Sequence, residues 1–412
     1  MNHLCLAFDR LHAGYLGCFG NTWIATPAFD RFAADALLFH QAHVDTTDAT
    51  EAYESLWRGT HRLERLLRPY DPPRPALAEA ARAAGLHTLL VTDDPSVGGH
   101  AAGAAFDDAL VLEGPEGEVA AAAGVDETHT ARFFAAAIDR LADVPEPFFA
   151  WIHARSLAGA WDAPPEFRDR YVEEDDPPAP TFTRLERREL PADVDLDERF
   201  GLSQAYAAQI ALLDVCLGGL LEHLDERGLD ERTNVGLLSV RGLALGEHSA
   251  VGPWDDRLQA ETVRVPWLLR PADRRIARCR SQALVQPADW YAAWVELVGG
   301  AADQGRYWSR SVLPSTTAGP SQPRDRAVVV GRTETGIAVP GWYLRRCGDP
   351  DGAGDALYVK PDDFWEANDV AARCADVAAS LRALDDAVRR AVADGVDPPP
   401  LADDDVLVVG AG

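Results

Sequence analysis

Residues 3–9 read HLCLAFD, and residues 26–33 read TPAFDRFA. The first stretch is an apolar run that ends in an acid, which predicts a buried β-strand with Asp9 at its end. The second stretch predicts a helix, because Thr26 suits the N-cap, Pro27 suits the first helical position, and apolar residues then recur at helical spacing. The chain therefore begins with a strand followed by a helix, as α/β folds do.

The same alternation of strands and helices continues along the chain. The apolar periodicity predicts helices near residues 76–84, 128–141 and 203–227, and strands near residues 87–91, 148–153 and 234–239. Strands separated by helices indicate an α/β fold with a central, mostly parallel sheet flanked by helices. Residues 173–188 combine several prolines with many charges and predict an exposed loop.

A stretch that contains proline and serine, residues 314–323, is the best candidate for a domain boundary. Beyond it, the sequence predicts short strands and one helix at residues 326–330, 342–346, 356–359 and 370–392. We therefore predict a large α/β domain over residues 1–315 and a small α+β C-terminal subdomain over residues 325–412.

Composition indicates which partners the chain is unsuited to bind and in which compartment it is found. The 412 residues include 39 Lys and Arg and 66 Asp and Glu, for a net charge of −27, which opposes binding to nucleic acid and to anionic lipid. The sequence predicts no membrane span, and its first residues lack the basic segment of a signal peptide. Six dispersed cysteines fit a reducing compartment. We therefore expect a cytoplasmic protein, whose ligand or partner the sequence does not name.

Four stretches, taken in order, resemble the sulfatase family of the alkaline phosphatase superfamily. They are residues 16–33, 206–218, 263–271 and 356–371, so the resemblance extends over nearly the whole chain. It implies an alkaline-phosphatase-like fold. It also implies hydrolysis of a sulfate ester by a hydrated formylglycine, made from the cysteine of a C-x-P-S-R motif, beside a divalent cation, typically calcium, held by carboxylates.

The residues that the resemblance places at the metal site differ from those of the family. The family has two aspartates where this chain has Asp9-Arg10, and S-D-H-G where it has S-V-R-G, with Val240 and Arg241 at the ligand positions. A hard cation needs several oxygen ligands, and only Asp9 of this set supplies them. We therefore predict that the chain binds no metal cofactor.

The nucleophile and the substrate pocket differ as well. The resemblance places Ala49 at the nucleophile and Tyr53 at the activating arginine, and neither side chain can do that chemistry. It places the remaining substrate-pocket residues at Asp93, Pro95, His153, Ala158 and Asp255. Asp93 and Asp255 occupy positions where the family has lysines, and Pro95 and Ala158 occupy positions where it has histidines. Lys360 is the only lysine of the chain.

These substitutions favour a non-catalytic sulfatase-like protein that acts through binding or as a scaffold. One alternative is a metal-dependent sulfate- or phosphate-ester hydrolase with Thr46, Thr47 or Thr50 as nucleophile, although we expect Thr50 to be the N-cap of a helix that begins near Glu51. Another is an arylsulfatase-like enzyme in a different register, but no C-x-P-S-R or S-x-P-S-R motif is present.

The two arginines of the former metal pairs suggest what replaced the cation. Arg10 and Arg241 each take one position of a pair, and a guanidinium can bond a carboxylate in two places. We predict that at least one of them forms an ion pair with Asp9. The alternative is that both point outward and bind an anion.

Overall fold

The computed structural model describes residues 1–115, 117, 119–155, 157–274, 276–300, 308–313, 324–348, 354–401 and 407. By its contacts the chain divides into two compact units. Unit 1 comprises Met1–His40, Ala81–Trp254 and Val265–Ser281, and unit 2 comprises Gln41–Ala80, Asp255–Arg264 and Gln282–Gly412. The predicted boundary at residues 314–323 lies outside the described residues, so the division into residues 1–315 and 325–412 stays a prediction.

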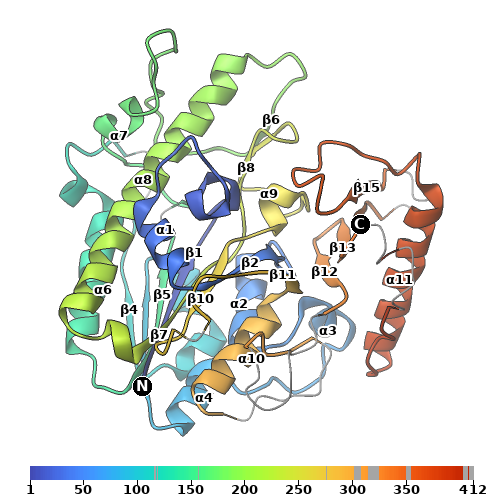
Figure 1. Cartoon of the computed structure of the whole chain (residues 1–412), viewed down its shortest axis with the longest axis horizontal. Coiled ribbons are helices and arrows are strands. Elements are labelled where there is room, and N and C mark those ends of the chain that lie inside the picture. Colours follow the sequence, from blue (N-terminus) through green and yellow to red (C-terminus); the bar gives the residue numbers. More distant parts are fainter. Residues whose placement is uncertain are drawn as a thin grey trace. The chain divides into compact units, whose positions relative to one another are not determined.

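The main sheet has eight strands in the order β11-β2-β10-β7-β1-β5-β3-β4 (Figure 1). In that order, the strands are Cys279–Val285, Leu37–Ala42, Trp267–Arg270, Thr233–Ser239, Asn2–Phe8, Phe148–Ala154, His87–Thr92 and Asp108–Val111. The five strands from β7 to β4 run parallel, whereas β10 is antiparallel to both of its neighbours. This is the predicted fold class, an α/β fold with a mostly parallel central sheet flanked by helices.

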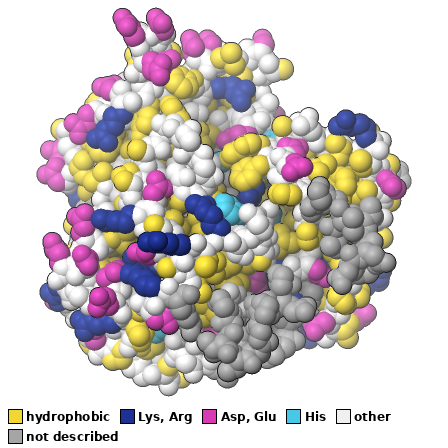
Figure 2. All heavy atoms as spheres, in the orientation of Figure 1, with side chains coloured by type: hydrophobic (Ala, Val, Ile, Leu, Met, Phe, Trp, Pro, Cys, Tyr) yellow, Lys and Arg dark blue, Asp and Glu magenta, His cyan; other side chains and the backbone are white. Residues whose placement is uncertain are grey.

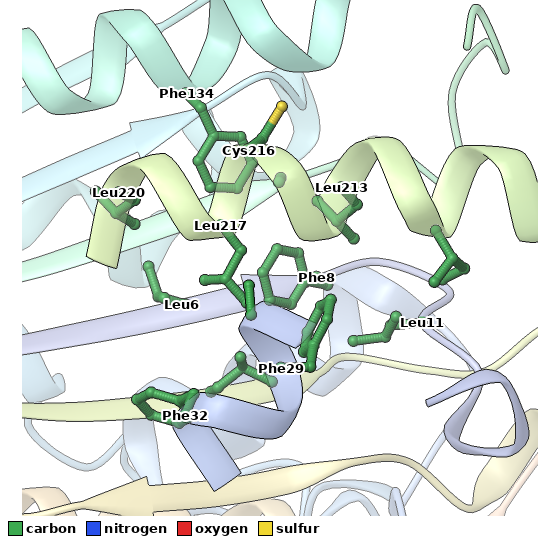
Figure 3. Close-up of a cluster of buried hydrophobic side chains, with 14 of the residues drawn as sticks. Leu6, Phe8, Leu11, Phe29, Phe32, Phe134, Leu213, Cys216, Leu217 and Leu220 are labelled. Atoms are coloured by element: carbon green, nitrogen blue, oxygen red, sulfur yellow. The ribbon is translucent and has the colours of Figure 1, made fainter. Parts of the chain in front are cut away.

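The core of unit 1 lies between this sheet and three helices. These are α1 (Pro27–Ala34), α6 (His129–Asp143) and α8 (Leu196–Glu226), of which α6 and α8 lie side by side (Figure 1). Figure 3 shows the packing of the buried side chains Leu6, Phe8, Leu11, Phe29, Phe32, Phe134, Leu213, Cys216, Leu217 and Leu220. Burial of these apolar groups is the main force that holds the helices on the sheet.

Helix α8 begins at Leu196, earlier than the predicted start near residue 203. The carboxylate of Asp195 caps it by accepting a hydrogen bond from the Asp197 amide, whereas the first turns are polar and exposed and so carry no apolar periodicity. Among the described helices, α8 is the one whose length and apolar composition would suffice to cross a membrane, and 72% of that apolar stretch is buried inside the protein, as in a core helix.

Unit 2 contains a small antiparallel sheet in the order β12-β13-β14-β15. Its strands are Ala327–Val330, Thr335–Val339, Trp342–Arg346 and Ala356–Val359, of which the sequence had not predicted β13. Helix α11 (Ala375–Ala393) packs against α3 (Arg62–Leu67) and β14, and helix α2 (Ala49–Arg58) packs against α10 (Pro287–Leu297).

The remaining α-helices and strands are short. They are α4 (Leu77–Ala83), α5 (Pro95–Gly98), α7 (Pro165–Asp169), β6 (Arg188–Glu189), β8 (Ala244–Leu245), β9 (Ala250–Gly252) and α9 (Ala260–Val263). The predicted loop at residues 173–188 contains no helix or strand before Arg188. On the face shown in Figure 2, acidic and basic side chains are interspersed with hydrophobic ones.

Candidate functional site

The predicted site residues of unit 1 meet at one edge of the sheet. Strands β7, β1, β5 and β3 are parallel neighbours, so their carboxyl ends lie together, where α/β folds place their ligand sites. The residues there are Val240 and Arg241 after β7, Asp9 and Arg10 after β1, His153 next to the last residue of β5, and Asp93 after β3. The fold therefore brings together residues separated by up to 232 positions.

Hydrogen bonds fix the turn that follows β1. The Val240 amide donates to the Phe8 carbonyl (2.8 Å), and the Tyr206 hydroxyl donates to the Arg10 carbonyl (2.7 Å). Arg10 has a left-handed φ of 66°, a conformation that costs energy in a residue other than glycine. These bonds hold Asp9 at the start of the turn, with its carboxylate buried.

The predicted ion pair with Asp9 is present, and Arg241 forms it. Arg241 Nε donates to Asp9 Oδ1 (2.8 Å), and Arg241 Nη2 donates to Asp9 Oδ2 (3.0 Å). Arg10 instead directs Nη1 towards the carbonyl of Gly242 (3.4 Å). The geometry is the two-point pairing that suits a guanidinium and a carboxylate.

The electrostatics of Asp9 follow from this pair. Burial raises the pKa of Asp9, but the charge and hydrogen bonds of Arg241 outweigh that effect. The charge of Arg10 lowers the pKa further, so the carboxyl is held well below its usual range. Asp9 is therefore ionised at neutral pH and is neutralised by a protein cation.

His153 and Asp93 have neighbours that the sequence did not predict. His153 Nδ1 lies 2.9 Å from Thr92 Oγ1, and burial lowers the pKa of His153, so the imidazole is neutral. Asp93 accepts hydrogen bonds from the Arg155 amide (2.6 Å) and lies 2.9 Å from His129 Nε2. His129 opens helix α6, and no local pattern in the sequence links it to Asp93.

Pro95 and Ala158 have local structural roles. Pro95 takes the first position of helix α5, capped by the carboxylate of Asp94, and its side chain is exposed. The Ala158 amide donates to the Arg155 carbonyl (2.7 Å) in the turn after β5. Neither side chain can replace the charge or hydrogen-bonding capacity of a histidine.

The residues that the resemblance places at the nucleophile belong to unit 2. Helix α2 begins at Ala49, and its N-cap is Asp48, whose carboxylate accepts a hydrogen bond from the Glu51 amide (3.1 Å). The prediction that Thr50 is the N-cap is therefore wrong. The carboxylate of Asp48, two residues before Thr50, reaches the free amides of the first turn and carries the negative charge that a helix N-terminus favours.

The other residues of this segment are held by local contacts. Thr47 Oγ1 donates to the Asp255 carbonyl (2.7 Å), and Thr46 Oγ1 accepts from the Asp48 amide (3.3 Å). Tyr53 is buried, and its ring centre lies 4.5 Å from that of Trp57. The Thr47 hydroxyl therefore has a structural role, because its hydrogen is bonded to a backbone carbonyl.

The side chains that the resemblance places at the metal site do not fit a divalent cation. Both oxygens of Asp9 are bonded to Arg241, Val240 offers no donor atom, and the guanidinium groups of Arg10 and Arg241 would repel a cation. Within the described ranges, no group of three or more His, Cys, Asp or Glu side chains could hold a metal ion.

Known structures share this fold. One is a phosphonate monoester hydrolase of Agrobacterium radiobacter, with a TM-score of 0.74, 18% identity, and coverage of 95% of this chain and 96% of that one. A second, solved with its substrate D-glucosamine-2-N,6-O-disulfate, has a TM-score of 0.72, 15% identity, and coverage of 96% and 99%. A third is a 2-O GAG sulfatase with a TM-score of 0.71, 17% identity, and coverage of 94% and 92%.

Sequence comparisons give the family. Among curated proteins, no sequence matches the chain at a significant level. The family model described as Sulfatase matches residues 2–301, which is most of the chain and contains every residue of the site described above. The chain therefore belongs to the sulfatase family, whose fold it keeps while an arginine pairs with the aspartate at the end of its first strand.

Proposed function

We propose that this member of the sulfatase family does not hydrolyse sulfate esters and instead acts through binding or as a scaffold. The observation that carries the proposal is the two-point pairing of Arg241 with both oxygens of Asp9. A metal ion in that position would bind an ester oxygen directly and stabilise charge in the transition state. A guanidinium already bonded to a carboxylate offers no open coordination position.

The residues of the nucleophile segment support the same conclusion. Ala49, at the position of the family's nucleophile, has no atom that can attack sulfur. Restoring that atom by Ala49→Cys should not restore turnover, because Val240 and Arg241 would still stand where the family has metal ligands. This proposal includes the absence of a bound metal cofactor.

We also propose a cytoplasmic location. The six cysteines all lie in the described part of the chain and form no disulfide, and Cys5, Cys18 and Cys216 are buried, where a reduced cysteine behaves as a small apolar side chain. A reducing compartment keeps such thiols unpaired. Fractionation of cells that produce the untagged chain tests this part of the proposal.

The main experiment combines metal analysis with activity assays on the purified chain. After dialysis against calcium, elemental analysis should find far less than one metal ion per chain, and 4-nitrophenyl sulfate and 4-nitrophenyl phosphate should not be hydrolysed above background. The intact mass should match the unmodified sequence. Stoichiometric metal, or hydrolysis that scales with protein through repurification, would overturn the proposal.

Two variants separate true activity from a contaminant. Asp9→Asn removes the remaining carboxylate of the former metal site, and Thr47→Val removes a hydroxyl of the nucleophile segment. A trace activity that both variants retain belongs to another protein. An activity that Asp9→Asn abolishes belongs to this site and contradicts the proposal, and one that Thr47→Val abolishes points to a threonine nucleophile.

A further inference from the structure

A hollow in unit 1, with a cavity volume of about 710 Å³, lies apart in sequence from the site residues described above. It is lined by the loop before α1, by the segment after α7 and by α8. The lining residues that matter here are aromatic or charged, with one exposed valine: Trp23, Arg170, Tyr171, Glu173, Asp176, Phe200, Asp214 and Val215. Its volume is in the range of small-molecule sites, about 300 to 1,000 Å³.

Three aromatic rings gather at this hollow. The ring centre of Trp23 lies 5.3 Å from that of Tyr171 and 5.8 Å from that of Phe200. Trp23 is 41% exposed and Val215 is 47% exposed, so two of the large apolar side chains left open to solvent line one hollow. Apolar area exposed in a concave place indicates a ligand site more than isolated exposed residues do.

The charges around the hollow are mostly negative. Three carboxylates, of Glu173, Asp176 and Asp214, face one guanidinium, that of Arg170, which gives a formal excess of two negative charges. The Arg170 guanidinium lies over the ring of Phe167, 3.9 Å from its centre. The formal charge of the residues that line the hollow is therefore negative.

Asp214 is fixed in position by the fold. Its carboxylate accepts hydrogen bonds from the amides of Ala28 (3.0 Å) and Phe29 (2.9 Å) at the start of helix α1. Burial raises the pKa of Asp214 to about 6, so the carboxylate is ionised at pH 8. A charge held this way loses no side-chain freedom when a ligand binds.

We propose that this hollow binds an organic ammonium ion that carries an apolar body. Aromatic faces attract a cation through their quadrupole and also cover apolar surface, and Trp is the strongest of the three rings. The surrounding carboxylates add attraction for positive charge and repel sulfate and phosphate esters. The proposal uses no residue of the former catalytic site, so it stands or falls independently of the proposed function.

The test uses three probes that share a phenylalkyl body and differ in charge: 2-phenylethylammonium, 2-phenylethanol and 3-phenylpropanoate. Each is titrated into the full chain at pH 8 and followed by calorimetry. The ammonium ion should bind at least about tenfold more tightly than the alcohol. The carboxylate should bind more weakly than the alcohol, because it meets the excess negative charge.

Variants locate the binding. Trp23→Ala should weaken binding of 2-phenylethylammonium about tenfold, and Glu173→Gln about threefold. Trp365→Ala is the matched control, since Trp365 is a tryptophan of unit 2 with a similar exposure of 44%, and it should leave the affinity unchanged. Should Trp23→Ala fail to fold, Trp23→Phe keeps an aromatic face and should retain most of the affinity.

Several outcomes would overturn the proposal. They are equal affinity for the ammonium ion and the alcohol, tighter binding of the carboxylate, and no saturable binding of the ammonium ion at millimolar concentration. Affinity that survives both Trp23→Ala and Glu173→Gln would place the binding elsewhere on the chain. None of these results depends on whether the protein hydrolyses an ester.

Discussion

The Asp9–Arg241 pair of unit 1 and the Asp289–Arg324 pair of unit 2 join the same two side-chain types in the same two-point geometry. In unit 2, Arg324 Nε lies 2.8 Å from Asp289 Oδ2, and Nη2 lies 2.5 Å from Oδ1. Both unit 2 side chains are buried, with 1% and 2% exposed, whereas Arg241 is 14% exposed. The pairs differ in what surrounds them.

The unit 2 pair is tied to the backbone of several segments. Asp289 also accepts hydrogen bonds from the amides of Gln286 (2.8 Å) and Arg310 (3.0 Å), and Arg324 also donates to the Trp308 carbonyl (3.3 Å). The Asp9 carboxylate accepts both of its side-chain bonds from Arg241. The Asp289–Arg324 pair therefore connects several segments of unit 2, whereas the Asp9–Arg241 pair neutralises a single buried carboxylate of unit 1.

The largest expected effect is that of Arg324→Ala. Removing this guanidinium leaves Asp289 charged and buried, which should lower the free energy of unfolding by about 3 to 5 kcal/mol. Urea denaturation measures the loss. Arg188→Ala is the control, because it breaks the exposed pair with Glu198 and should cost under about 1 kcal/mol. A similar loss in the two variants would remove the distinction between buried and exposed pairs.

Arg241→Ala should cost less, about 2 to 3 kcal/mol, because water reaches the vacated position and Arg10 still offsets part of the Asp9 charge. The double variant Asp9→Asn/Arg241→Met removes both charges and should recover most of that loss. If Arg241→Ala leaves stability unchanged, the pair does not replace a lost cation, and the proposed origin of the site is wrong.

The two regions should also differ in their response to acid. His61, whose Nε2 lies 3.3 Å from Gln286 Oε1 beside the unit 2 pair, is buried, and burial lowers its pKa to about 4. The unfolded chain takes up a proton on this histidine below about pH 6.5, whereas the folded protein does so only near pH 4. Protonation of His61 therefore favours the unfolded state, and stability falls as the pH drops from about 6.5 to 4. The pKa of Asp9 is lowered from a carboxyl value, so its contribution is lost only below about pH 4.

The variant His61→Gln tests that difference. Between pH 7 and 4.5 it should lose less stability than the unchanged protein, by on the order of 2 kcal/mol. The double variant Asp9→Asn/Arg241→Met should show the same slope as the unchanged protein in that range, because Asp9 of the unchanged protein stays ionised there. Urea midpoints at a series of pH values give both slopes. His3 and His43, whose pKa values burial also lowers, still contribute to the slope that remains.

The sequence predicted the elements whose signal is local. Apolar runs located β1, β3, β5 and β7. The motifs that resemble the sulfatase family assigned Arg241 and Asp9 to the same site, and this assignment predicted the ion pair. The sequence did not predict β2 or the partnership of His129 with Asp93, which lie 36 residues apart. Such pairings are set by tertiary packing, which periodicity along one segment does not contain.

The smallest expected effect concerns a third carboxylate, that of Asp48. It is exposed and accepts one backbone hydrogen bond as the N-cap of α2, so Asp48→Ala should cost about 1 kcal/mol, and Asp48→Ser should cost far less because serine also caps. Thr50→Ala should change stability by only a few tenths of a kcal/mol, since Thr50 lies inside the helix and alanine favours helix. Urea denaturation of the three variants ranks them. A larger loss for Thr50→Ala than for Asp48→Ala would place the helix start near Glu51, and would break the rule that a carboxylate's contribution follows its burial and its number of bonds.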